Sequence, residues 1–176
     1  MTCGIIVFLL GTAALVWFTW SFSIKERRYH GIFRFFAFEA LLALLLLNHR
    51  HWFHHGCSPA QTLSWLVLFA SLFLAVHGFR LLRRVGKPRD QIEDTTVLVE
   101  EGAFRYIRHP LYCSLLLLTI GIFLKRMTTG TTVLALISIL ALYLTAKTEE
   151  HEMLQKFGRV YEDYMRRTKM FIPWVW

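Results

Sequence analysis

Five stretches of the chain are nearly free of charged residues, and this pattern constrains the fold more than any other feature. They run from Gly4 to Ile24, Phe33 to Leu47, Thr62 to Phe79, Leu111 to Leu124 and Thr131 to Ala146. A helix needs about 20 apolar residues to cross the hydrocarbon core of a bilayer, which is roughly 30 Å thick. The shorter stretches need flanking residues, or Lys and Arg side chains that extend to the headgroups. We therefore expect an all-α integral membrane protein with five transmembrane helices.

The composition excludes several other classes of protein. Hydrophobic residues make up 55% of the chain, which is far too many for a disordered protein. The three cysteines are too few, and odd in number, for a disulfide framework. All four prolines lie outside the apolar stretches, as unbroken helices require. The first stretch has no basic start and no cleavage pattern, so we read it as a helix and not as a signal peptide.

The formal net charge of +8 is distributed unevenly along the chain. Seventeen of the 20 Lys and Arg residues lie in three segments, 25–34, 80–108 and 147–169, and the others are Arg50, Lys125 and Arg126. By the positive-inside rule the three basic segments face the cytoplasm. Five spans then place the N-terminus outside and the C-terminus inside. Anionic headgroups are a sufficient partner for this charge, so we expect no nucleic acid and no obligate protein partner.

Polar residues gather in two of these segments, Arg80–Pro110 and Lys147–Pro173. Both are predicted to be cytoplasmic, and an active site needs the ionisable groups that they contain. We therefore treat residues 1–176 as a single membrane domain. Residues 1–79 form a three-helix scaffold, and residues 80–176 form the catalytic part.

The first polar segment ends in Arg108-His109-Pro110-x-Tyr112, at the start of the fourth apolar stretch. Proline suits the first turn of a helix, where its missing N–H is not needed. The free N–H groups of that turn, the helix dipole and Arg108 together favour an anion. Gly102, a few residues earlier, indicates a turn. The alternative reading is an Arg-rich membrane flank followed by a proline that starts a helix.

The second polar segment begins with Glu149 and Glu150, directly after the fifth stretch, where the positive-inside rule favours cations. Apolar and aromatic residues then recur at helical spacing, namely Leu154, Phe157, Tyr161 and Tyr164. This spacing is typical of an amphipathic helix on the membrane surface, with its tyrosines at headgroup depth. The glutamate pair has no comparable structural explanation.

The two segments together resemble the isoprenylcysteine carboxyl methyltransferase family, which is related to the membrane phospholipid methyltransferases. The resemblance rests on Arg108-His109-Pro110-x-Tyr112, Glu149-Glu150 and Phe157-Gly158-x-x-Tyr161-x-x-Tyr164, and it covers about the last 80 residues. It implies a membrane enzyme that uses S-adenosylmethionine and releases S-adenosylhomocysteine, with a C-terminal cytoplasmic helix closing the cofactor pocket. The chain also lacks the Gly-x-Gly-x-x-Gly of a Rossmann fold.

The resemblance also implies roles for individual residues. Arg108 would bind the cofactor carboxylate, Glu149 or Glu150 its ammonium group, and the backbone of 97–99 its adenine. The cofactor-binding candidates are Val97, Leu98, Val99, Gly102, Arg108, His109, Tyr112 and Glu150. The catalytic candidates are His109, Glu149 and Glu150, and no metal ligand is assigned.

The acceptor is expected to be a lipid-like or amphiphilic molecule that enters from the bilayer. A carboxylate acceptor needs no base, whereas an amine or thiol needs one, and His109, Glu149 or His151 can serve. Members of the family usually carry an Arg shortly before the glutamate pair, where this chain has Thr145, with Lys147 as the nearest cation. This difference disfavours a prenylcysteine acceptor more than it affects the cofactor site.

Two other functions compete with this interpretation. One is an NADPH-dependent membrane reductase of the steroid-reductase type, which has a similar helical layout near its C-terminus. The other is a protein that handles a metal or haem, suggested by the four histidines His49, His51, His54 and His55. Glu39, inside the second apolar stretch, is expected to need a buried partner.

Overall fold

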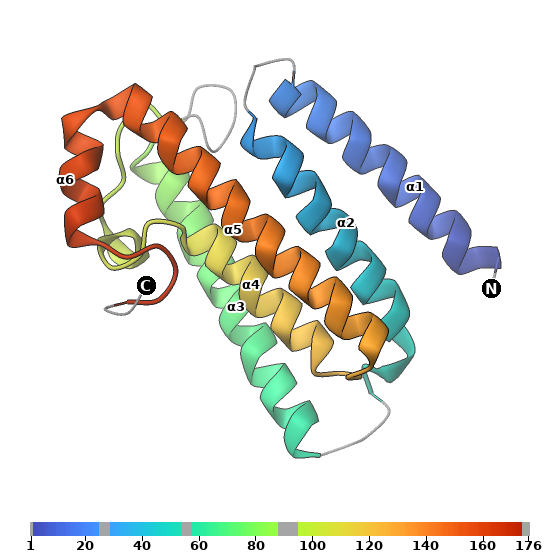
Figure 1. Cartoon of the computed structure of the whole chain (residues 1–176). Helices are drawn as coiled ribbons and strands as arrows, with labels where there is room; N and C mark the ends of the chain where they lie inside the picture. The colour runs from blue at the N-terminus through green and yellow to red at the C-terminus, as the bar shows by residue number, and fades with distance from the viewer. Residues whose placement is uncertain (1, 25–28, 54–57, 88–94, 174–176) are drawn as a thin grey trace.

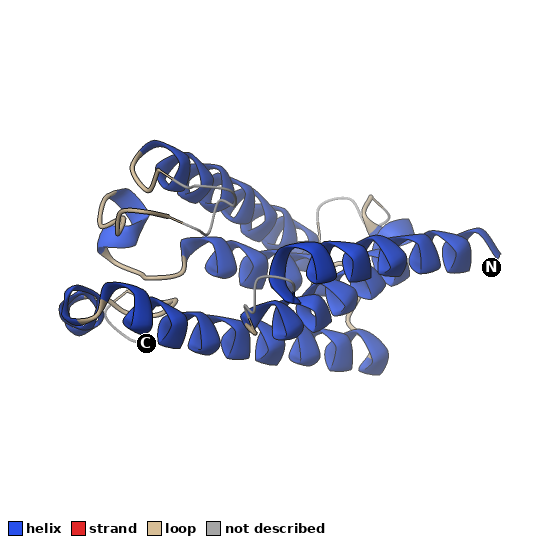
Figure 2. Cartoon of the chain, turned by 90° about the horizontal axis from the view of Figure 1, so that it is seen from above, coloured by secondary structure: helices blue, strands red, loops and turns tan. Residues whose placement is uncertain are grey.

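The computed structural model describes residues 2–24, 29–53, 58–87 and 95–173 (Figure 1). In this part of the chain all regular secondary structure is helical (Figure 2). The elements are α1 (Thr2–Thr19), a π-helical turn (Trp20–Ile24), α2 (His30–Asn48), a 3-10 turn (His49–His51), α3 (Pro59–Arg84), a second 3-10 turn (Gly102–Arg105), α4 (Pro110–Phe123), α5 (Thr129–Phe157) and α6 (Arg159–Arg167). The described structure therefore agrees with the all-α class.

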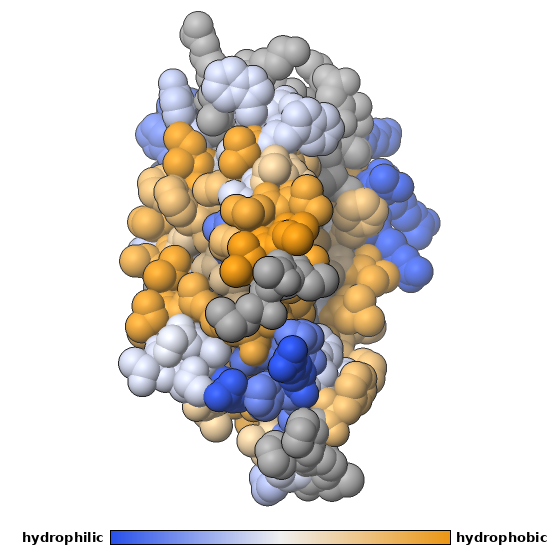
Figure 3. Space-filling view, turned by 90° about the vertical axis from the view of Figure 1, so that its right-hand side faces the viewer, coloured by the Kyte–Doolittle hydropathy of each residue, from blue (hydrophilic) through white to orange (hydrophobic). Residues whose placement is uncertain are grey.

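Four helices are long and apolar enough to cross a membrane: Gly4–Ser23, His30–His51, Pro59–Arg84 and Thr129–Phe157. The protein is thus an integral, multi-pass membrane protein. The fourth apolar stretch forms α4, which has 14 residues and is about 21 Å long at 1.5 Å per residue. It is apolar but shorter than the others, so a fifth span remains a prediction. Figure 3 shows hydrophobic side chains gathered across the middle of one face.

Small residues allow α2 and α5 to pack closely. Ala37 of α2 and Leu142 and Ala146 of α5 are fully buried in one cluster. Close approach through small side chains is a common way for helices to associate in lipid, where no hydrophobic effect drives them together. α4 packs against both α3 and α5, so it lies within the bundle (Figure 1).

Polar side chains join the helices inside the apolar region. Ser64 of α3 donates a hydrogen bond to the carbonyl of Gly121 at 2.6 Å, and Ser71 donates to the carbonyl of Ser114 at 2.7 Å. Asn48, at the end of α2, donates to the carbonyl of Ile122 at 2.8 Å. These bonds satisfy polar groups that have no water to bind in the hydrocarbon core.

The structure corrects the assignment of Arg34 to the first basic segment, 25–34, which the sequence indicates as a loop between two helices. Arg34 lies inside α2 and is buried, and its guanidinium donates to Ser23 Oγ at 3.0 Å. α2 begins at His30, before the apolar stretch, so Arg34 is part of the helix. The long side chain of Arg34 is tolerated there because its stem packs among the helices while its charged head has a polar partner. Glu39 has the partner that its position required, since Thr12 of α1 donates to its Oε1 at 2.6 Å.

The chain after α6 returns to the start of α4 (Figure 1). We call residues Thr168–Phe171 the C-terminal strap. Lys169 N donates to the Tyr106 carbonyl at 3.1 Å, and Arg108 N donates to the Lys169 carbonyl at 2.8 Å. His109 N donates to the Met170 carbonyl at 3.2 Å. The strap is therefore attached to the residues that precede α4, and the side chain of Phe171 is buried in the core.

Candidate active site

The first wall of the site is the start of α4. Pro110 occupies the first helical position, as the sequence predicts, and His109 is the residue that caps the helix. Hydrogen bonds to the strap hold the backbone of Arg108 and His109. The two side chains consequently leave the chain from a fixed position at the mouth of the bundle.

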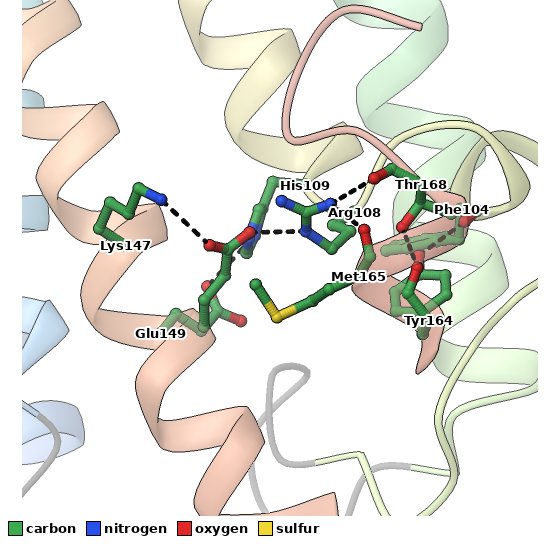
Figure 4. Close-up of polar contacts among 9 residues, drawn as sticks. Phe104, Arg108, His109, Lys147, Glu149, Tyr164, Met165 and Thr168 are labelled. Carbon is green, nitrogen blue, oxygen red and sulfur yellow. Dashed lines mark hydrogen bonds and ion pairs between the residues drawn. The ribbon is translucent and has the colours of Figure 1, made fainter. Parts of the chain in front are cut away.

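Arg108 connects three segments that are distant in sequence (Figure 4). Its Nε donates to Glu150 Oε1 at 2.6 Å. Its Nη1 donates to the carbonyl of Thr168 at 2.5 Å and to that of Met165 at 3.3 Å. The start of α4, the end of α5 and the end of α6 therefore meet at one guanidinium group.

His109 lies between the two glutamates of α5. Its Nδ1 is 3.8 Å from Glu149 Oε2, and its Nε2 is 3.5 Å from Glu150 Oε1. Nε2 is buried and makes no hydrogen bond with a described residue. The ring stacks on Tyr112, with 5.5 Å between centroids, so the orientation of the imidazole is set by an aromatic neighbour as well as by charge.

Glu149 and Glu150 belong to α5 itself, which continues to Phe157 without a break. Consecutive residues on a helix point about 100° apart, so the two carboxylates face different neighbours. Glu150 has 4% of its side chain exposed, and it contacts Arg108 at 2.6 Å and Lys147 at 3.8 Å. Glu149 has 15% of its side chain exposed and lines the cleft described below.

The tyrosines of α6 are not interfacial anchors, which corrects the surface-helix interpretation. Tyr161 and Tyr164 are 3% and 2% exposed, and Tyr164 donates from its hydroxyl to the carbonyl of Phe104 at 2.6 Å. Burial, and then the charges of Glu149 and Glu150, raise the pKa of Tyr161. α6 packs on the bundle through these rings because their spacing of three residues places both on one face.

A cleft lies between these elements, at the end of the bundle that carries the basic segments. Its cavity volume is about 70 Å³, and the space between its walls reaches about 620 Å³ when the part open to solvent is included. Its lining includes Thr95, Leu98, Val99, Phe104, Arg108, His109, Tyr112, Glu149, Met153, Tyr161 and Tyr164. The walls are largely apolar, and the ionisable groups gather at the start of α4 and the end of α5.

The structure brings most of the candidate residues to this cleft, although not all of them. Leu98, Val99, Arg108, His109, Tyr112 and Glu149 line it. Val97 and Gly102 are exposed and do not line it, and Glu150 lies behind Arg108. Gly102 has a φ of +56° and lies against α3, where an added Cβ atom would be 2.6 Å from His77 Nε2.

Two lining residues, Thr95 and Met153, escaped the sequence reasoning. They reach the cleft because distant segments fold together. Met153 lies four residues after Glu149, so the helical spacing of α5 already places the two on one face. No comparable periodicity marks Thr95, which follows a region outside the described residues.

His49 and His51 are the two described residues of the predicted histidine cluster. No three His, Cys, Asp or Glu side chains come together within the described residues in a way that would hold a metal. His54 and His55 are not among the described residues, and neither are Lys25, Arg27, Arg28 and Arg89 of the predicted cytoplasmic segments.

Comparison with known proteins identifies the family. The phospholipid methyltransferase family model matches residues 60–161, which include the first motif, Glu149-Glu150 and nearly all of α3. Methanethiol S-methyltransferase of Crocosphaera subtropica is 31% identical over 121 residues, 64% of this chain and 44% of that protein. Methanethiol S-methyltransferase 1 of Bradyrhizobium diazoefficiens is 26% identical over 118 residues, which are 63% of this chain and 39% of that protein. The methanethiol S-methyltransferase of Pseudomonas deceptionensis is 28% identical over 129 residues, which are 67% of this chain and 46% of that protein.

The chain spans less than half the length of these relatives. The family match covers more than half of the chain, from α3 to α6, and leaves α1 and α2 outside. It confirms the resemblance to membrane methyltransferases that the two motifs indicated. This chain belongs to the phospholipid methyltransferase family.

Proposed function

We propose that the protein is an S-adenosylmethionine-dependent membrane methyltransferase with its active site in the cleft between α4, α5 and α6. The observation that supports this most directly is the convergence of Arg108, His109 and Glu149 on one partly enclosed cleft. These residues come from two motifs, and all three residues lie within the family match. Methyl transfer is therefore favoured over the NADPH-dependent reductase.

The residues of the cleft suit this cofactor. Leu98, Val99 and Phe104 offer apolar surface to a nucleoside, and the Glu149 carboxylate offers an acceptor to an ammonium group. The aromatic faces of Tyr112 and Tyr161 suit a sulfonium cation. His109 lines the cleft and stacks on Tyr112, so its ring can contact a ligand there. The cleft, at about 70 Å³, is smaller than the usual small-molecule site of about 300–1,000 Å³. Binding therefore requires the walls to separate.

S-adenosylmethionine supplies an activated methyl group on sulfur. The task of the protein is to align the acceptor with that methyl group and to exclude water, for which the apolar walls are suited. When the acceptor is neutral, it must also lose a proton. His109 can take that proton, because it lines the cleft and its ring lies within 4 Å of the carboxylates of Glu149 and Glu150.

Two classes of acceptor follow from the observations. The relatives are named methanethiol S-methyltransferases, which supports a small thiol. The membrane setting and the apolar cleft support a lipid-like or amphiphilic acceptor that arrives from the bilayer. Thr145, where many isoprenylcysteine enzymes have Arg, is fully buried and donates to the Ala141 carbonyl. It supplies no cation for a prenylcysteine carboxylate.

The orientation and the division of labour belong to the same proposal. The cleft lies at the end of the bundle with the basic segments, which the positive-inside rule assigns to the cytoplasm. The N-terminus would then be outside and the C-terminus inside. Residues 1–79 serve as scaffold, and residues 80–176 carry the chemistry, because the lining residues of the cleft come from the second part.

Calorimetric titration of the purified protein with S-adenosylhomocysteine tests the proposal. Saturable binding is expected, and NADPH should give no signal. Arg108→Ala, His109→Ala and Glu150→Ala should each weaken binding while leaving membrane insertion intact. Unchanged affinity in all three variants would refute the proposed pocket. Turnover is then measured by transfer of a labelled methyl group to methanethiol and to a prenylcysteine.

A further inference from the structure

We infer that Arg108 and Glu150 are positioning residues that hold α6 and the C-terminal strap, whereas Glu149 binds the ammonium group of the cofactor. The inference rests on the proposed function for the identity of the cofactor. It gives the two adjacent glutamates different roles, and it replaces the direct role that the motif suggested for Arg108.

Arg108 is largely occupied by the protein. A guanidinium has five N–H donors, and three of them are used by Glu150, Thr168 and Met165. Its charge is already balanced by Glu150 at 2.6 Å, and both side chains are less than 10% exposed. An incoming carboxylate would have to compete with a short, buried ion pair, whose disruption is costly.

The two carbonyl groups that Arg108 binds lie at the end of α6. The last four carbonyls of a helix lack partners within the helix, and a cation is stabilised there by the helix dipole. Met165 is in the last turn of α6, and Thr168 directly follows the helix. Arg108 therefore caps α6, the helix that places Tyr161 and Tyr164 in the cleft.

Glu150 and Glu149 differ in what surrounds them. Both oxygens of Glu150 face basic side chains, with Oε1 2.6 Å from Arg108 Nε and 3.5 Å from His109 Nε2, and Oε2 3.8 Å from Lys147 Nζ. Glu149 lines the cleft, and among the described residues its ion-pair partner is His109 alone, at 3.8 Å. Figure 4 shows Glu149 on α5, apart from the cluster of contacts around Thr168. Glu149 is thus the carboxylate with room for a cationic ligand.

Titration with two ligands distinguishes a positioning residue from a residue that contacts the ligand directly. S-adenosylhomocysteine carries a carboxylate and an ammonium group, whereas 5′-methylthioadenosine shares its nucleoside and thioether and lacks both. Arg108→Ala and Glu150→Gln should reduce the affinity for both ligands by the same factor, because they disturb the walls. Glu149→Gln should reduce the affinity for S-adenosylhomocysteine about tenfold, the scale of one charged hydrogen bond, and should leave 5′-methylthioadenosine within about twofold.

Hydrogen exchange gives a readout that does not depend on any ligand. The amides of Thr168 and Lys169 are bonded to the carbonyls of Tyr164 and Tyr106, so they should exchange slowly. Arg108→Ala should accelerate their exchange, and Glu149→Gln should not. Arg166→Ala is the matched control, because Arg166 is an exposed arginine of α6 that pairs with Glu162 on the same helix.

The outcomes are distinct. A loss of affinity in Arg108→Ala that is confined to S-adenosylhomocysteine would make Arg108 a direct ligand and overturn the inference. An equal loss for both ligands in Glu149→Gln would overturn the role of Glu149. If the wild-type protein binds neither ligand, the proposed function fails, while the exchange data still test the cap on α6. If Arg108→Ala does not fold, Glu150→Gln decides with the same two ligands.

Discussion

Replacement of Gly102 by Ala is expected to destabilise the protein, because Gly102 is one of two glycines of positive φ among the described residues and the one whose added Cβ would meet other atoms. Gly102 has a φ of +56°, where a side chain costs roughly 1–2 kcal/mol. An added Cβ would also lie 2.6 Å from His77 Nε2 and from Leu81 Cδ1 of α3. Overpacking in a core costs about 1–3 kcal/mol, and this contact should cost less because both atoms are the ends of side chains that can shift. The free energy of unfolding should therefore fall by about 1–3 kcal/mol.

Two other glycines separate these contributions. Gly158 also has a φ of +56° but has no atom within 4 Å of an added Cβ, so Gly158→Ala reports the backbone cost alone. Gly130 lies in α5 with open space around it, and Gly130→Ala should stabilise the helix by up to about 1 kcal/mol. Thermal unfolding in micelles, followed by circular dichroism, ranks the three variants. Equal melting temperatures for the Gly102 and Gly158 variants would show that contact with α3 does not constrain this turn.

The remaining predictions concern the buried tyrosines. Tyr164→Phe leaves the buried Phe104 carbonyl without its hydrogen bond, so the free energy of unfolding should fall by about 1–3 kcal/mol. Tyr29→Phe, at an exposed position, should melt like the wild type, and a similar loss in both variants would contradict the role of the bond. Burial raises the pKa of Tyr161 and Tyr164 above the ordinary value of 10.0. The unfolded chain therefore releases these protons first, so stability is complete below pH 10.0 and falls above it. The melting temperature should fall less steeply with pH above this value for the double variant Tyr161→Phe/Tyr164→Phe than for the wild type. Identical slopes in the two proteins would argue against the pKa shifts.

The apolar stretches determined the helical class and the membrane setting, because the need for about 20 apolar residues per span is a property of the bilayer. The structure places α1, α2, α3 and α5 on four of the stretches. The start of α4 at Pro110 was equally predictable, since proline is restricted to the first turn of a helix. The position of Arg34 was not, because charge alone does not show that a long side chain finds Ser23 across a helix contact.

Sequence by itself also placed Arg108, His109, Glu149 and Glu150 together at one end of the bundle, since two motifs at the ends of adjacent helices must meet there. Only the tertiary structure shows how the surroundings of these groups differ. Glu149 and Glu150 are chemically identical neighbours, and they differ because one turns toward the cleft and the other toward Arg108. Likewise, Tyr161 and Tyr164 are typical of a surface helix by composition. They are buried because Arg108 and Phe104, which precede α4, bind α6 and the strap through contacts between residues that are about 60 positions apart in the chain.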